Sequence, residues 1–256
     1  MKKILLQLSY LGGAYAGFQV QKNALTVQQA LQDALCALLS QRPSVTGCSR
    51  TDAGVHARRY YAAFETSAAL PVTRYPAALN AHLPRDISVL DAHEVGQDFH
   101  PRYDAVAKTY RYRIWLRRPR NVFEAQTSYH HPRPLDVKTF VALAPLFEGT
   151  HDFRGFASSG GCVRSTVRTI YSCRAWEKEG MLTLSITGNG FLYNMVRIVA
   201  GTLIAAATGG ETDIPSILKS GDRTRAGATA PAHGLTLWQV YYPAGTTGLV
   251  ETEVSG

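Results

Sequence analysis

The chain has 256 residues, of which 45% are hydrophobic and 18% charged, and its formal net charge is +8 with a pI near 9.4. This composition is that of an ordinary globular protein, large enough for one domain or for two of about 125 residues. No run approaches the roughly 18 apolar residues of a membrane helix, and Gln7 and Ser9 interrupt the apolar run after Met1, so we expect neither a membrane span nor a secretory signal. The basic balance favours a polyanionic partner.

The cysteines and histidines give no metal-binding pattern. Cys36, Cys48, Cys162 and Cys173 form no CxxC pair, and the adjacent His130 and His131 lack a metal-ligand spacing. We therefore predict no metal and no cofactor, and we expect reduced thiols in a cytoplasmic protein.

The first hundred residues predict the order strand, helix, strand, strand, helix, strand. A buried strand over 3–10 ends in a glycine-containing loop that lets the backbone come close to another group. Thr26 begins a helix, with Gln29 completing a capping box. The remaining elements are strands near 45–46, 60–66 and 86–94 and a short helix over 75–82.

The second half predicts the same order. A strand over 107–116 is followed by a helix from Asp136 to about 147, a hairpin of strands 167–176 and 181–187, and a helix over 191–208 that Gly209 and Gly210 end. Asp213 begins a short extra helix, 235–242 is the last strand, and the tail from Gly245 to Gly256 carries no recognisable signal. The predicted fold is α+β with two ferredoxin-like (β-α-β-β-α-β) halves, 1–103 and 104–256, largely antiparallel sheets and an active-site cleft between them.

Residues 47–56, GCSRTDAGVH, concentrate the groups that could carry chemistry. Gly54 can take a positive φ and Asp52 can bond its own backbone, so a carboxylate is predicted at the tip of a tight turn. An Asp-Ala-Gly sequence alone is most often only a surface turn. Arg50 before it and His56 after it favour a functional site.

Two other stretches allow a structural and a functional interpretation. Tyr110, Tyr112 and Lys108 share one face of a strand, either as aromatic core or as a platform that stacks a flipped base beside cations. Arg197 lies in an otherwise apolar helix, where it either reaches solvent or needs an anionic partner, for which Asp52 is the natural candidate.

Residues 49–57, SRTDAGVHA, closely resemble the catalytic motif GRTDAGVHA of the TruA-type tRNA pseudouridine synthases, with Ser49 replacing glycine. Residues 10–21 resemble the family's YDGxxYxGWQxQ, with Leu11 replacing Asp and Phe18 replacing Trp. Further blocks at 99–112, 149–156, 188–197 and 219–235 resemble FHARFSAxxKxYxY, GxHDFxxF, GxxFLxxMVR and KDRxxAGxTAPAxGLxL. The resemblance extends in the family's order from about residue 10 to residue 242.

The resemblance implies an isomerase that converts uridine to pseudouridine at positions thirty-eight to forty of the tRNA anticodon arm, acting as a homodimer without cofactor. It makes Asp52 the catalytic aspartate, either as nucleophile at C1′ or as base at C2′, and pairs Arg197 with it. Tyr110 would pack on the target base, and Arg50 would fill the vacated space or hold a phosphate. His56 and Lys108 are further candidates for substrate binding.

Two other classes of function compete with this interpretation. A non-catalytic RNA-binding module explains the charge and the aromatic residues equally well, but it does not require Asp52 together with Arg50 and Arg197. An acid–base hydrolase using Asp52 and His56 lacks a second carboxylate or nucleophile at a suggestive spacing.

Overall fold

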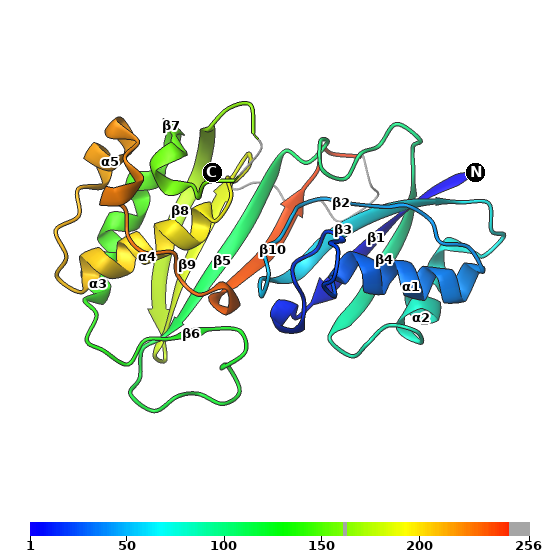
Figure 1. Ribbon diagram of the computed structural model, residues 1–256, viewed down its shortest axis with the longest axis horizontal. Coiled ribbons are helices and arrows are strands. Elements are labelled where there is room, and N and C mark those ends of the chain that lie inside the picture. Colours follow the sequence, from blue (N-terminus) through cyan, green and yellow to red (C-terminus); the bar gives the residue numbers. More distant parts are fainter. Residues whose placement is uncertain (161–162, 246–256) are drawn as a thin grey trace. The chain divides into compact units, whose positions relative to one another are not determined.

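The computed structural model describes residues 1–160 and 163–245, and its chain divides into two compact units (Figure 1). Unit 1 comprises Met1–Ala107 and the described residues from Leu237 onward, and unit 2 comprises Lys108–Thr236. Each unit combines helices with a mostly antiparallel sheet. Within the described ranges, no helix is both long and apolar enough to cross a membrane. The division lies a few residues after the boundary predicted from the sequence. The two predicted domains, 1–103 and 104–256, remain a prediction.

Unit 1 has the predicted order of elements. Its strands are β1 (Lys2–Tyr10), β2 (Val45–Gly47), β3 (His56–Thr66) and β4 (Ile87–Val95), and its helices are α1 (Val27–Leu39) and α2 (Tyr75–Asn80). Strand β1 lies between β4 and β3 with antiparallel pairing, and β2 and β10 (Leu235–Tyr241) both pair with β3. The predicted cap of α1 is confirmed, because Thr26 Oγ1 accepts a hydrogen bond from Gln29 N at 3.3 Å.

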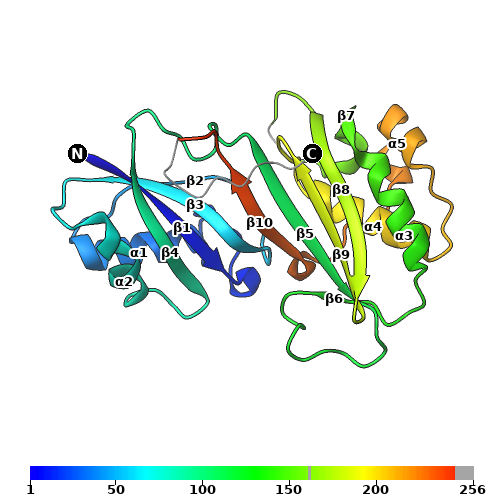
Figure 2. The ribbon, with the colours of Figure 1, turned by 180° about the vertical axis from the view of Figure 1, so that it is seen from behind.

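Unit 2 contains the sheet order β5-β9-β8-β7. Its strands are β5 (Ala107–Trp115), β6 (Tyr129–His130), β7 (Gly149–Asp152), β8 (Val167–Lys178) and β9 (Met181–Gly188), and its helices are α3 (Val137–Leu143), α4 (Met195–Ala207) and α5 (Ile214–Ser220). Helices α3 and α4 pack against each other and cover one face of this sheet; Figure 2 presents the opposite face. Short 3-10 turns occupy Gly12–Ala14, Val72–Arg74, Ala144–Phe147, Phe153–Phe156, Arg223–Arg225 and Ala232–Gly234.

The structure corrects three predicted elements. The helix predicted over 191–208 begins only at Met195, because Asn194 adopts a left-handed conformation with φ of 60° that interrupts a helix. The helix from Asp136 ends at Leu143 and continues as a 3-10 turn containing Pro145, which lacks an N–H donor. Strand β3 begins at residue 56 instead of 60, and residues 149–156, for which no element was predicted, form strand β7 and a 3-10 turn. The tail over 246–256 lies outside the described residues.

The burial of His131 makes the stability of unit 2 depend on pH. Its side chain is buried, and burial first, then the charges of Arg133 and His130, lower its pKa below the ordinary 6.5. The unfolded chain therefore binds a proton more readily than the folded chain, so the free energy of unfolding decreases as the pH falls through about 6.5. We expect His131→Gln to flatten this decrease in urea titrations between neutral and mildly acidic pH. The exposed His82→Gln should retain the wild-type dependence, and equal slopes for both variants would contradict the prediction.

Candidate active site

The predicted turn at Asp52 is present between β2 and β3. Val55 N donates to Asp52 O at 3.1 Å, and Gly54 has a φ of 78°, as the third residue of such a turn requires. We call residues 52–55 the Asp52 turn. The Asp52 side chain is half-buried and that of Arg50 is exposed. The carboxylate is thus held on a short, defined turn with a cation close by in the chain.

A second segment, residues 11–18, holds the Asp52 turn from outside; we call it the glycine loop. Gly54 N donates to Tyr15 O at 3.3 Å, and Phe18 N donates to Thr51 O at 3.2 Å. The Thr51 hydroxyl also bonds the Tyr10 hydroxyl at 2.8 Å. These bonds use mainly backbone atoms, so they fix the course of the chain on both sides of Asp52.

Two glycines allow this close approach. A Cβ on Gly12 would lie 2.0 Å from Val55 O, and a Cβ on Gly17, whose φ is 96°, would lie 2.6 Å from Thr51 O. Neither distance is compatible with a side chain. The sequence predicted a loop whose backbone comes close to another group, and the structure identifies that group as the backbone around Asp52.

His56 serves the same arrangement. Its side chain is only 2% exposed, and its Nδ1 accepts a hydrogen bond from Gly12 N at 3.0 Å. An accepting Nδ1 carries no proton, so the bond fixes the tautomer of the ring. This contact favours a function of His56 in positioning the glycine loop. That His56 binds the substrate directly remains a prediction.

Two of the three departures from the family motifs meet at Tyr60. Its hydroxyl donates to Ser49 O and accepts from Ser49 N at 3.3 Å, while its ring stacks on Phe18 with the ring centres 4.3 Å apart. Ser49 has no positive φ, so its backbone conformation does not require glycine. The third departure, Leu11, donates its N–H to Asp86 O at 2.9 Å. All three therefore fit the local structure of unit 1.

In unit 2, strand β5 carries the two tyrosines in different environments. Tyr112 is fully buried and donates its hydroxyl to Pro231 O at 2.9 Å, so it belongs to the core. Tyr110 is 7% exposed, and its ring contacts that of Phe191 edge to face at 5.1 Å. Lys108, opposite Gly188 in strand β9, is half-buried.

Arg197 is held by the segment 226–231 and by its own helix. Its Nε donates to Ala230 O at 2.8 Å, its Nη1 donates to Asn194 Oδ1 at 2.7 Å, and Ala230 N donates back to Arg197 O at 3.1 Å. Segment 226–231 lies so close to α4 that a Cβ on Gly201 would be 1.8 Å from Ala228 O. Arg197 is half-buried, and the two bonds of its side chain fix the direction of the guanidinium. No signal in the sequence indicates the contact with Ala230.

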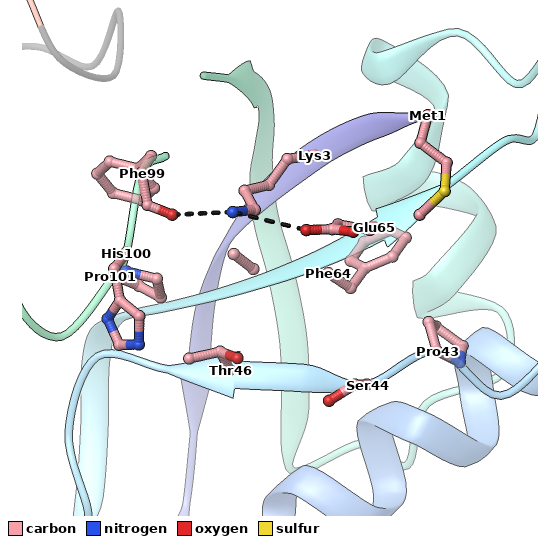
Figure 3. A pocket seen from close by; sticks show the side chains of 11 residues that line it. Met1, Lys3, Pro43, Ser44, Thr46, Phe64, Glu65, Phe99, His100 and Pro101 are labelled. Carbon is pink, nitrogen blue, oxygen red and sulfur yellow. Dashed lines mark hydrogen bonds and ion pairs between the residues drawn. The ribbon is translucent and has the colours of Figure 1, made fainter. Parts of the chain in front are cut away.

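A pocket within unit 1 lies away from the Asp52 turn. It has a volume of about 430 Å³ and is lined by Met1, Lys3, Pro43, Ser44, Thr46, Ala63, Phe64, Glu65, Phe99, His100 and Pro101 (Figure 3). The Lys3 ammonium inside it already donates to Gln97 O and Phe99 O and lies 3.6 Å from Glu65. None of the predicted site residues lines this pocket. Over the described part of the chain, no three His, Cys, Asp or Glu side chains gather into a group that could hold a metal ion.

Comparison with known proteins identifies the family to which the chain belongs. The sequence profile described as tRNA pseudouridine synthase matches residues 8–104 and 143–243. Proteins named tRNA pseudouridine synthase A from Ruminiclostridium cellulolyticum and Citrifermentans bemidjiense are 47% and 44% identical to the chain, covering 94% of it and 100% and 98% of their own lengths. A chain from a structure of an H/ACA ribonucleoprotein bound to a substrate RNA containing 2′-deoxyuridine aligns over 96% of this chain and 49% of its own, with a TM-score of 0.42 and 10% identity. The profile and the two relatives show that the chain belongs to the tRNA pseudouridine synthase family.

Proposed function

We propose that this protein isomerises uridine to pseudouridine in tRNA, with Asp52 as the catalytic carboxylate. The observation that carries the proposal is the half-buried Asp52 on a turn that the glycine loop fixes on both sides. A carboxylate that must meet one atom of a sugar needs such fixed placement, because small displacements of a reacting group cost large factors in rate.

The reaction breaks the N1–C1′ bond of uridine, rotates the uracil and joins C5 to C1′, while C5 loses a proton and N1 gains one. It neither oxidises nor reduces the nucleoside, so one correctly placed carboxylate and a pocket that retains the free base suffice. Asp52 acts either as nucleophile at C1′ or as base at the C2′ proton, and both functions require the ionised carboxylate.

The other site residues have supporting functions in the proposal. Arg197 supplies the cation that favours ionised Asp52, as the family resemblance implies. Tyr110 packs on the extruded base, Lys108 binds phosphate, and Arg50 binds phosphate or occupies the space that the base leaves. His56 keeps the glycine loop against the Asp52 turn.

The finer features of the proposal depend on the family resemblance. They are the anticodon arm as the target, with uridines at positions thirty-eight to forty, a homodimer as the active form, a cytoplasmic location, and two ferredoxin-like halves that both contribute site residues. The +8 net charge supports an RNA substrate.

Asp52→Asn tests the catalytic function directly. The amide keeps the size of the side chain and removes its charge, so we expect pseudouridine formation to be abolished while tRNA binding stays near wild type. The measurement is carbodiimide-stop mapping of unmodified tRNA transcripts incubated without added metal or cofactor. Binding by the wild type without any stops would indicate an RNA-binding module, and stops with Asp52→Asn would refute the proposed mechanism.

Arg197 variants test the electrostatic function. If Arg197 lies beside Asp52 as proposed, removing the cation takes a stabilising charge from the carboxylate, so the pKa of Asp52 rises. Arg197→Met should therefore move the acid limb of the kcat/KM profile to higher pH. Arg197→Lys retains the charge, and its acid limb should stay near that of the wild type although its rate falls. A uniform loss of rate in Arg197→Met, without a shift of the limb, would indicate a structural function only.

Gly12→Ala tests whether the glycine loop controls the Asp52 turn. The added methyl group would lie 2.0 Å from Val55 O, whereas Gly13→Ala, the control, adds a methyl with no atom within 4 Å. Overpacking of this kind costs about 1–3 kcal/mol, and we expect kcat to fall by at least about tenfold as the turn shifts. Wild-type kcat in a folded Gly12→Ala variant would refute this dependence; thermal melting of both variants checks that they fold.

A further inference from the structure

The connection between β5 and β6, residues 116–128, projects beyond the end of the unit 2 sheet (Figures 1 and 2); we call it the arginine loop. Between Asp104 and Asp136 the sequence has a single acidic residue, Glu124, against seven Lys and Arg residues: Lys108, Arg111, Arg113, Arg117, Arg118, Arg120 and Arg133. Within the loop, Arg117, Arg118 and Arg120 are exposed. This part of unit 2 is therefore strongly basic.

The one acidic residue is neutralised inside the protein. Arg113 Nη1 and Nη2 donate to the two carboxylate oxygens of Glu124 at 2.6 and 2.9 Å, and Thr127 Oγ1 donates to it at 3.2 Å. The bond from Arg113 is the largest cause that lowers the pKa of Glu124. Because this ion pair uses the acidic charge for an internal bond, the arginines at the surface have no acidic partner within the loop.

Internal bonds also fix the shape of the arginine loop. Trp115 Nε1 donates to Pro119 O at 2.7 Å, Ser128 Oγ donates to Glu124 O at 2.8 Å, and His130 Nε2 bonds Arg117 O at 3.1 Å. The loop thus holds its conformation through contacts at its base and at its centre. A preformed loop loses little conformational entropy on binding a partner.

The fixed loop exposes an aromatic ring. Phe123 is 95% exposed and its neighbour Val122 is 69% exposed, while Phe123 N donates to Asn121 Oδ1 at 3.1 Å and so keeps the residue in place. An exposed ring that follows the exposed Arg118 and Arg120 in the same loop has the composition of a single-stranded nucleic-acid contact, in which the ring stacks on a base and the cations bind phosphates.

We propose that Arg118, Arg120 and Phe123 form a second contact surface for the RNA substrate, separate from the reacting nucleotide; this inference rests on the proposed function. The loop begins after Trp115, five residues along β5 from Tyr110, and at a rise of about 3.4 Å per residue this is about 17 Å. The surface therefore contacts nucleotides away from the target base. A second copy of the chain is a poorer occupant, because a two-fold contact would bring the arginines of both copies together.

The test compares each variant with a matched control. Phe123→Ala removes the ring, and Val122→Ala removes a neighbouring apolar side chain that cannot stack. Arg120→Glu and Arg74→Glu make the same change of charge, but Arg74 lies in unit 1, at the end of the 3-10 turn Val72–Arg74. Filter binding gives the Kd for unmodified tRNA over a series of salt concentrations, and steady-state assays give kcat and KM.

We expect Phe123→Ala and Arg120→Glu each to raise the Kd and KM of tRNA by about tenfold at low salt with little change in kcat, because the first variant loses a stacked base and the second a phosphate contact. Arg120→Glu should also reduce the slope of log Kd against log salt concentration by about the amount that one phosphate contact contributes. Both controls should keep the Kd and KM of the wild type. Unchanged Kd values, or equal losses for Arg120→Glu and Arg74→Glu, would overturn the inference.

Analytical sedimentation tests whether a second copy of the chain, instead of RNA, occupies this surface. If the loop variants changed the mass of the particle and left the binding of RNA unaltered, the surface would be a contact between subunits and the inference would be wrong. Because the Kd decides the inference independently of turnover, failure of the proposed function appears separately, as absence of pseudouridine formation by the wild type.

Discussion

The backbone contact between the glycine loop and the Asp52 turn is the constraint on which the candidate site in unit 1 depends. It joins the end of β1 to the start of β3, two strands that pair along most of their lengths. The sheet pairing alone would not determine the direction of Asp52, because the residue lies beyond the paired segments. Hydrogen bonds from Gly54 and Phe18, together with the ring of His56, extend the order of the sheet into the turn.

In unit 2 a comparable constraint acts on Arg197. The helix α4 has Gly201 one turn after Arg197, and this glycine lets segment 226–231 lie directly against the helix. Ala230 then bonds both the backbone and the guanidinium of Arg197. In both units, a glycine allows backbone to approach backbone, and the approach fixes the charged side chain nearby.

Much of this arrangement could be predicted from the sequence. Hydrophobic periodicity and caps located most elements, because α1 and β1 bury the residues that their patterns select. The start of α4 was placed wrongly, since the left-handed Asn194 has no distinct sequence signal. The Asp52 turn could be predicted from Gly54, but its contacts with the glycine loop could not. Bonds such as that from Gly54 N to Tyr15 O join backbone atoms, which every residue type carries. The contact between Arg197 and Ala230 could not be predicted for the same reason, because Ala230 contributes only its carbonyl and its amide.

The kind of atom that each glycine faces determines how the chain can change during evolution. At Gly47, an added methyl group would meet the Tyr60 hydroxyl and the Phe18 ring, both of them side chains that a second substitution could shorten. At Gly12 it would meet the carbonyl oxygen of Val55, which no substitution at residue 55 removes. A compensating mutation is therefore available for a change at Gly47 and unavailable at Val55 for a change at Gly12. A genetic screen should therefore recover suppressors of a Gly47 substitution at Tyr60 or Phe18. It should recover no suppressor of a Gly12 substitution at Val55.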